Sequence, residues 1–282
     1  AWWVEVKSHE AFGLHSTHWL GNHGHVKGLR DQAEERLAVA RAPCNVLRWC
    51  SPAVVFFFPQ GVDAGVRDEL RRMGAHVLDG TRELGPQLPP LPPPITRVNL
   101  DVTALCALVS EVSNGGAVNG GTPEVLAWAQ RISHWVDSVA MEAAEPLLPQ
   151  LEPVFEGRQL IASSTAVEHF EKLLATCGGP RERARWHDWL SRIRVVRPPS
   201  TESSDGADTD GTGWPGAAPH KFFSERVARL EGVAPAQRWV LGLSDAAHAI
   251  TIAANGKVLK AAVKQGVELE AHVHRAMWLT GL

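Results

Sequence analysis

The sequence predicts an α/β fold divided between two units, each built as a three-layer sandwich of helices around a sheet. Short apolar segments alternate with segments in which apolar residues recur every three or four positions, a pattern typical of strands followed by helices. Six prolines within residues 85–96 interrupt the pattern, because proline continues neither a helix nor a central strand. We therefore expect residues 1–84 and 97–282 to fold as separate units joined by a stiff linker.

In the first unit the pattern predicts strand, helix, strand, helix and strand. Leu29, Ala33 and Leu37 lie at helical spacing, an apolar run ends at Pro59, and Asp63 suits the N-cap of the next helix. The expected elements are a strand at 2–8, a helix at 27–42, a strand at 53–58, and a helix followed by a short strand within 63–80.

The second unit opens with the strand "RVNL", followed by a helix. Residues 197–221 are polar and rich in glycine and proline, so we expect a mobile surface insertion at about 198–220. The other expected elements are a mostly helical stretch at 122–155, a strand at 158–163, a helix at 164–179, a helix leading into a strand at 180–196, strands at 237–245 and 249–255, a helix at 256–266 and a last strand at 267–274.

The composition limits the classes of function. A formal net charge of −3 gives no overall attraction for nucleic acid, so a basic surface must be local. The four cysteines show no C-x-x-C spacing, which favours an intracellular, cytoplasmic or nuclear location. No apolar run reaches the roughly 20 residues that span a bilayer, so we expect no membrane partner. The chain begins without Met inside an apparent strand, and we expect further residues upstream.

Acidic and amide side chains at the ends of expected strands are the main candidates for chemistry. Asp101, Asp245 and Asn255 each follow such a strand, and Glu168 and Glu171 lie early in the helix after "RQLIAS". Open α/β sheets place ligand sites at strand ends, and clustered carboxylates suit Mg²⁺ or Mn²⁺. Taken singly, the two aspartates are equally typical of helix N-caps, and the two glutamates of solvated helix faces.

The stretches "RVNLDVTALCALVS", "RQLIASSTAVEHFEKLL" and "GLSDAAHAITIAANGKVLKAAVKQGVEL" resemble the PIN domains, a fold of metal-dependent ribonucleases. Through the phrases "VNLD", "CGGPRER" and "AANGKVLKAAVKQGVE", residues 97–282 also resemble the C-terminal half of an uncharacterised eukaryotic family with a PIN-like domain. The resemblance implies a metal-dependent endoribonuclease in which Asp101 and Asp245 hold the ion and Glu168 or Glu171 completes its shell. Asn255 would contact the metal or the water that attacks the phosphodiester.

Three departures from the PIN pattern leave an alternative open. The second acid of the family falls near His169 or Phe170 here, and the fourth position is the neutral Asn255. Asp245 lies ten residues before Asn255, closer than the family's spacing. The alternative is a catalytically degenerate PIN fold that binds RNA, or serves as a scaffold with protein partners in a larger assembly.

A basic segment in the second unit is the candidate RNA track. Arg181, Arg183 and Arg185 precede Trp186, and arginines interleaved with aromatic residues suit phosphate contacts and base stacking on single-stranded RNA. The alternative is a helix whose tryptophans face the core and whose arginines form a solvated face.

Glu5 and Lys7 form an E-x-K arrangement on one face of the first expected strand. The order of elements in residues 1–84 resembles restriction-endonuclease-like folds, which use such a pair to bind a metal and polarise water. This is a weak second site, and an exposed strand face is the alternative.

Two further patterns point away from other classes of site. His9, His15, His18, His23 and His25 lie in one loop, but their spacing matches no familiar zinc pattern, which favours polar or phosphate contacts. The segment "GNHGHVKG" fits neither glycine-rich phosphate-loop motif, so a nucleotide-binding enzyme of those classes is not expected.

Overall fold

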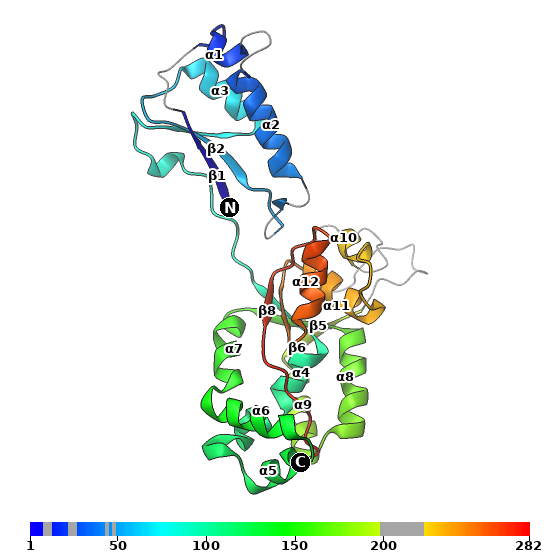
Figure 1. Ribbon diagram of the computed structural model, residues 1–282. Coiled ribbons are helices and arrows are strands. Elements are labelled where there is room, and N and C mark those ends of the chain that lie inside the picture. The colour runs from blue at the N-terminus through cyan, green and yellow to red at the C-terminus, as the bar shows by residue number, and fades with distance from the viewer. Residues whose placement is uncertain (8–12, 22–26, 43–44, 47–48, 198–222) are drawn as a thin grey trace. The chain divides into compact units, whose positions relative to one another are not determined.

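The computed structural model describes residues 1–7, 13–21, 27–42, 45–46, 49–197 and 223–282. The chain forms two compact units, unit 1 (Ala1–Pro94) and unit 2 (Ile95–Leu282), and each is described by itself (Figure 1). The boundary between them falls inside the proline-rich segment. The expected surface insertion at about 198–220 lies outside the described residues.

Unit 1 contains a parallel sheet of order β1-β2-β3. Its elements are β1 (Trp2–Val6), α1 (Thr17–Leu20), α2 (Leu29–Arg41), β2 (Ala53–Phe58), α3 (Ala64–Met73), β3 (His76–Asp79) and the 3₁₀ helix η2 (Gly85–Gln87). Asp63 caps α3 as expected, accepting hydrogen bonds from the backbone N–H groups of Gly65 and Val66. The order of strands and helices is the predicted one, with α1 in addition.

Among the residues of unit 1 that the structure describes, helices pack on one face of the sheet, and the predicted third layer remains a prediction. Helices α2 and α3 pack on one face of the sheet, where Phe56 and Phe58 are fully buried. On the opposite face of β1, Trp2, Val4 and Val6 are exposed. Among the described residues, no helix buries these three side chains, so the restriction-endonuclease-like layout remains a prediction.

Unit 2 contains a five-stranded parallel sheet of order β6-β5-β4-β7-β8. Its strands are β4 (Arg97–Leu100), β5 (Gln159–Ser163), β6 (Ile193–Val196), β7 (Ile250–Ala253) and β8 (Ala271–Val273). Strands buried on both faces read as continuous apolar runs, which is why most of these segments are recognisable in the sequence.

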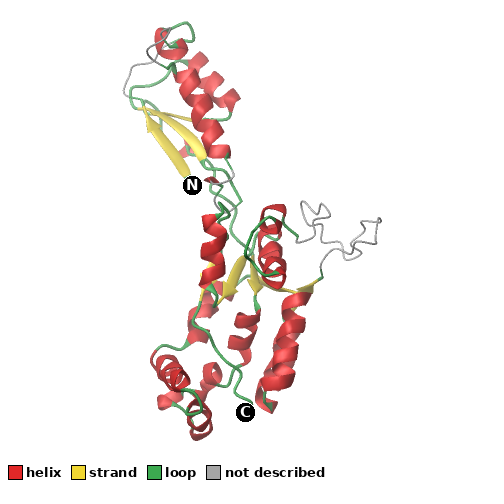
Figure 2. Cartoon of the chain, turned by 45° about the vertical axis from the view of Figure 1, so that its right-hand side comes forward, coloured by secondary structure: helices red, strands yellow, loops and turns green. Residues whose placement is uncertain are grey.

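Helices cover both faces of the unit 2 sheet, which confirms the α/β class and gives this unit three layers (Figure 2). The helices are α4 (Val102–Val109), α5 (Pro123–Ala129), α6 (Ser133–Ala144), α7 (Leu147–Phe155), α8 (Ser164–Cys177), α9 (Pro180–Leu190), α10 (Glu225–Ala228), α11 (Pro235–Ala246) and α12 (Gly256–Lys264), with the short turns η3 (Val112–Gly116) and η4 (Val118–Gly120). Leu100 and Ile252 face the core formed with α4, whereas Ile161 packs against Leu243 of α11 on the other face.

The structure corrects two predicted elements. Residues 237–245, predicted as a strand, lie within helix α11. The last strand is shorter than predicted and covers Ala271–Val273. Within the described residues, every helix is too short or too polar to cross a bilayer.

Candidate functional site

The polar residues that follow β4 and β7 lie at one edge of the unit 2 sheet. From the central strand β4 the chain proceeds to β5 and β6 on one side, and it reaches β7 and β8 on the other. The strand order therefore reverses between β4 and β7, and doubly wound sheets bind ligands outside the carboxyl ends of strands at such a point. Asp101 follows β4 directly, and Asn255 lies two residues beyond β7.

Asp101 is the N-cap of α4. Its Oδ1 accepts hydrogen bonds from the backbone N–H of Ala104 at 2.8 Å and from the Thr103 hydroxyl at 2.6 Å. The Thr103 oxygen accepts in turn from the backbone N–H of Ala254 at 2.7 Å, which ties α4 to the end of β7. Burial raises the pKa of Asp101, and its hydrogen bonds oppose this shift only in part.

A pocket of about 340 Å³ opens beside Asp101, between the sheet, α8, α11 and α12. Its polar lining, besides Asp101 and Thr103, consists of Thr165, His169, Gln237, Thr251 and Asn255. The remaining lining residues are apolar and come largely from α11 and α12. Asp101 is the one carboxylate in this lining among the residues that the structure describes.

Four helices begin at this pocket. Helices α4, α8 and α12 follow the carboxyl ends of parallel strands, and α11 runs back along the sheet to precede β7. Asp101 caps α4 and Ser163 caps α8 through side-chain hydrogen bonds, but α11 and α12 have no side-chain cap. Uncapped helix N-termini present N–H donors and the positive end of the helix dipole, so this edge favours an anion.

Asp245 does not lie at this edge. It occupies the last turn of α11, and α11 runs from the pocket toward the strand starts. The carbonyl of Ala247, just after α11, accepts a hydrogen bond from Arg97 at the start of β4 at 3.1 Å. Asp101, at the end of β4, is therefore separated from Asp245 by the length of the sheet, and the structure does not bring the two together.

Asp245 is instead held in a buried ion pair. Its carboxylate accepts hydrogen bonds from the Ser224 hydroxyl at 2.5 Å and from Nε of Arg226 at 2.8 Å, and it also contacts Nη2 of Arg226. Only 6% of the Asp245 side chain is exposed, so this contact stabilises the fold rather than presenting an acid to a ligand.

Glu168 and Glu171 also lie away from the pocket. Both are exposed on α8, and Glu171 accepts a hydrogen bond from the indole N–H of Trp186 at 3.2 Å. The residues of α8 that line the pocket instead include Thr165 and His169, in the first two turns of the helix. The solvated helix face, the alternative for the two glutamates, matches their positions.

The expected RNA track is occupied by contacts within unit 2. Arg181 and Arg185 bind the buried Glu111 at 3.0 and 2.7 Å, and Arg183 donates to the carbonyl of Ala175. Trp186 is buried, with its ring edge-on to Phe170 at 4.7 Å between centroids. Trp186 therefore belongs to the core and cannot stack on a base.

In unit 1 the two residues of the E-x-K arrangement, Glu5 and Lys7, form an ion pair with each other. The ammonium of Lys7 donates to Glu5 at 2.5 Å and to Gln32 of α2 at 2.6 Å, and Arg36 donates to Glu5 at 3.2 Å. These contacts join β1 to α2 and account for both residues without a metal. Of the five histidines in the neighbouring loop, His9, His23 and His25 lie outside the described residues, and His15 and His18 are exposed.

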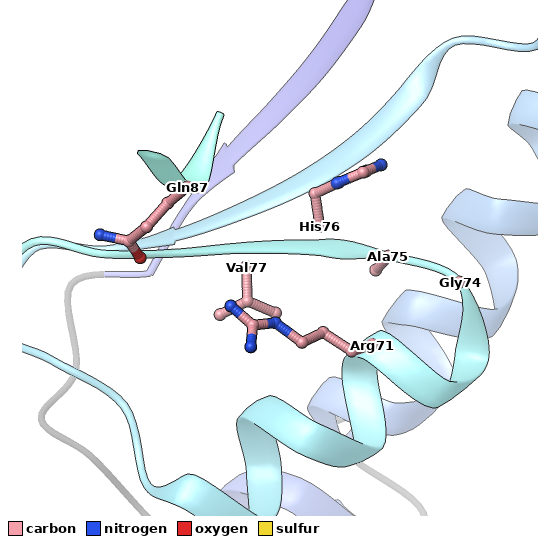
Figure 3. A pocket seen from close by; sticks show the side chains of 6 residues that line it. All are labelled: Arg71, Gly74, Ala75, His76, Val77 and Gln87. Carbon is pink, nitrogen blue, oxygen red and sulfur yellow. The ribbon is translucent and has the colours of Figure 1, made fainter. Parts of the chain in front are cut away.

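Unit 1 also has a pocket, of about 390 Å³, between α3, β3 and Gln87. Figure 3 shows His76 and Val77 on opposite sides of β3, with the Arg71 side chain extending from α3 on the side of Val77. Gln87 is already bonded to the backbone of Asp79, donating to its carbonyl and accepting from its N–H. None of the described residues that line this pocket has a buried side-chain polar atom without a partner, so the unit 2 pocket is the stronger candidate.

The unit 2 pocket supplies one carboxylate, Asp101, to the expected Mg²⁺ or Mn²⁺ ion, and its Oδ1 already accepts two hydrogen bonds. Mg²⁺ is usually held through one or two carboxylates together with waters and substrate phosphates, so the metal remains a prediction. Across the part of the chain that the structure describes, no three His, Cys, Asp or Glu side chains gather in a way that could hold a metal.

Three residues that line the pocket are not predicted from the sequence: Thr165, Gln237 and Thr251. Gln237 lies in the segment 237–245, which the apolar pattern predicts as a strand, although Pro235 is a typical first residue of a helix. Thr165 and His169 share one face of α8 at a spacing of four residues, and this periodicity was the available signal.

Unit 2 is therefore a doubly wound α/β domain. Its pocket lies at the switch point, where the strand order reverses between β4 and β7, and Asp101 is the one carboxylate in the described lining. Residues 98–208 match a family described as "Protein of unknown function (DUF1308)". This range carries Asp101, Thr165 and His169, whereas Gln237, Thr251 and Asn255 lie beyond it. No solved structure matches the chain.

Proposed function

We propose that this protein carries a PIN-like domain in unit 2 that binds single-stranded RNA at the switch-point pocket without hydrolysing it. The observation that carries the proposal is a pocket at the beginnings of four helices that contains one carboxylate. Such a pocket attracts the phosphate of a nucleic acid. The resemblance to PIN domains supports RNA as the class of ligand.

The surroundings of the pocket add positive charge. Lys257 and Lys260 are exposed in the first two turns of α12, whose Val258 and Leu259 line the pocket. Lysines near a bound strand add phosphate contacts, and such binding weakens as salt concentration rises. A concave pocket of about 340 Å³ admits part of a single strand, whereas the paired bases of a duplex cannot enter it.

The second candidate function is the metal-dependent endoribonuclease. It is favoured by the meeting of Asp101 and Asn255 at one pocket, as the PIN resemblance implies. Against it stand the separation of Asp245, the outward position of Glu168 and Glu171, and the neutral side chains at the remaining positions.

The substitution Asp101→Asn separates the two functions because they predict opposite results. Asparagine caps helices as well as aspartate does, so the fold should persist. If the pocket binds phosphate directly, removing the negative charge should tighten RNA binding by about three- to tenfold, since a unit charge at contact distance contributes about 1 kcal/mol or more. We would measure fluorescence anisotropy of a short labelled RNA in EDTA, and cleavage of the same RNA in Mn²⁺.

A pair of charge reversals on α12 serves as the control for location. Lys257→Glu lies in the first turn and should weaken binding several-fold, whereas Lys264→Glu lies in the last turn of the same helix and should have a smaller effect. Cleavage by the wild-type protein that disappears in Asp101→Asn would contradict the proposal and favour the nuclease. Absence of RNA binding by the full chain would reject both.

The affinity advantage of Asp101→Asn should depend on pH. Burial raises the pKa of Asp101, so its carboxyl loses its charge as the pH falls through that raised value. The wild-type affinity should then approach that of Asp101→Asn in acid, and the two should differ most at neutral pH. Comparing the two proteins at each pH isolates the residue at position 101, because the rest of the pocket lining is identical. A ratio that stays constant with pH would show that Asp101 does not face the ligand.

A further inference from the structure

The lining of the unit 2 pocket contains a polar group that has no hydrogen-bond partner among the described residues. Thr251 of β7 lines the pocket and is fully buried, yet its Oγ1 makes no hydrogen bond within the described residues. Its cross-strand neighbour Asn99 of β4 is also fully buried, and the Oδ1 of Asn99 likewise has no partner there. The Nδ2 of Asn99 donates to the carbonyl of Val240 in α11 at 3.1 Å.

An unpaired buried hydroxyl costs stability, because it has lost its bonds to water. Most buried polar groups find a partner, so an exception calls for an explanation, and a bound ligand is one explanation. Thr251 lies on β7 next to β4, the two strands between which the strand order reverses. A ligand that supplies a hydrogen bond to Thr251 would remove this cost.

The walls of the pocket show what else such a ligand carries. Val240 and Leu241 of α11, Ala253 of β7, and Val258 and Leu259 of α12 present apolar surface in the same pocket. A phosphate alone would gain nothing from these walls. Small-molecule sites combine an apolar lining with a few polar groups and have volumes of about 300 Å³ and above. The amides of Gln237 and Asn255, at the same pocket, can each donate and accept.

We infer that the pocket takes up one unstacked base of the bound RNA, with the Thr251 hydroxyl on its edge and the adjoining phosphate at the helix N-termini of α11 and α12. This inference rests on the proposed function and deepens it, because it makes the pocket a reader of bases as well as of phosphates. A base is flat and apolar on its faces and has hydrogen-bonding groups at its edge, and proteins that recognise single-stranded RNA bind splayed-out bases in this way.

The first experiment is a set of calorimetric titrations of the full chain. Its probes are the four nucleoside 5′-monophosphates, ribose 5-phosphate and inorganic phosphate. The inference predicts that at least one nucleotide binds tenfold or more tightly than ribose 5-phosphate, since only the nucleotide fills the apolar pocket. Equal binding of nucleotides and ribose 5-phosphate would overturn the inference, whatever their absolute affinity.

The second experiment uses Thr251→Val, which replaces the hydroxyl with a methyl group of nearly the same size. Because the hydroxyl is unpaired in the free protein, the midpoint of urea unfolding should stay the same or rise. Binding of a short RNA should weaken by about five- to tenfold, the loss of one hydrogen bond. The control Thr176→Val changes an exposed threonine on α8, remote from the pocket lining, and should leave binding unchanged.

An RNA carrying abasic sites distinguishes failure of this inference from failure of the proposed function. Abasic RNA should bind the wild type and Thr251→Val equally, and more weakly than intact RNA binds the wild type. If intact and abasic RNA bind alike, the protein binds the backbone alone, and the inference fails while RNA binding stands. If neither binds, both proposals fail. A Thr251→Val protein that is less stable and binds intact RNA normally would show that the hydroxyl is a structural group.

Discussion

Replacing Glu182 with alanine is expected to lower the free energy of unfolding of unit 2 by about 3–5 kcal/mol. Glu182 lies in the first turn of α9 and is fully buried. Its removal would leave several buried N–H and O–H donors without an acceptor, at about 1–3 kcal/mol for each that stays unsatisfied. A loss of this size is a large part of the stability of an ordinary domain.

The Glu182 carboxylate accepts five hydrogen bonds from three parts of unit 2. The backbone N–H of Gly179, the N-cap of α9, donates at 3.0 Å, which is the one bond of a capping box that a glycine N-cap can make. The backbone N–H of Glu111, after α4, donates at 3.2 Å. The segment after β8 supplies the N–H and hydroxyl of Thr280 at 2.8 and 3.0 Å and the N–H of Gly281 at 3.2 Å.

The packing around this carboxylate requires glycine. A Cβ at Gly179 would lie 1.9 Å from the carbonyl oxygen of Leu282. Any other residue at position 179 would therefore force the backbone at Leu282 to move. Glu182 and Gly179 therefore act together to hold the segment 280–282 against α9.

Urea unfolding followed by tryptophan fluorescence would measure the change for Glu182→Ala, with hydrogen–deuterium exchange of residues 274–282 as a local readout. Exchange there should accelerate before the rest of unit 2 opens. Glu168→Ala removes an exposed glutamate from α8 and should change the stability by no more than about 0.5 kcal/mol. A Glu182→Ala protein as stable as this control would show that water replaces the lost carboxylate at little cost.

The sequence predicts most of the unit 2 sheet because parallel strands bury both faces. The exception is α11, because the apolar pattern of "QRWVLGLSD" predicts a strand. Residues Val240 to Asp245 are all buried, so this part of the helix has no solvent-exposed polar face. The sequence therefore lacks the alternation of polar and apolar faces that identifies a surface helix. A short apolar run cannot be assigned by periodicity alone, and Pro235 at its start was the signal that favoured a helix.

The site was predictable where residues follow strands and unpredictable where contacts are distant in the sequence. Asp101 and Asn255 reach the pocket because each follows the carboxyl end of a strand. Nothing local shows that Arg181 and Arg185 would bind Glu111, which lies 70 and 74 residues away in the chain. If residues 237–245 formed a strand, Asp245 would lie at the carboxyl end of the sheet, beside Asp101. Because they form helix α11, Asp245 lies at the opposite end, near the starts of the strands.

The second large effect is expected for Asp245→Ala, which should destabilise unit 2 by about 2–4 kcal/mol. Removing one partner of a buried ion pair leaves the other charge without compensation, at a cost of about 3–5 kcal/mol when both are fully buried. The range is set lower here because 29% of the Arg226 side chain is exposed and can regain water. The Asp245 carboxylate raises the pKa of Arg226, so the arginine stays charged in the native protein.

The destabilisation should begin at α10, because Ser224 and Arg226 come from that helix and its N-cap. Hydrogen–deuterium exchange should increase first at Val227 and Leu230, which are buried beside α11 and α12. Asp245→Asn, which keeps the shape and the bond to Ser224 but removes the charge, should fall between the wild type and Asp245→Ala. Asp188→Ala removes an aspartate that is 86% exposed on α9 and serves as the matched control.

The sign of the stability change at Asp245 discriminates between an ion pair and a metal ligand. Carboxylates clustered to bind a cation repel one another, so removing one stabilises the metal-free protein. The contacts with Ser224 and Arg226 predict the opposite, a loss of stability that added Mn²⁺ does not change. An Asp245→Ala protein that is more stable than the wild type in EDTA, and that has lost a stabilisation by Mn²⁺, would restore Asp245 as a metal ligand and contradict the arrangement described here.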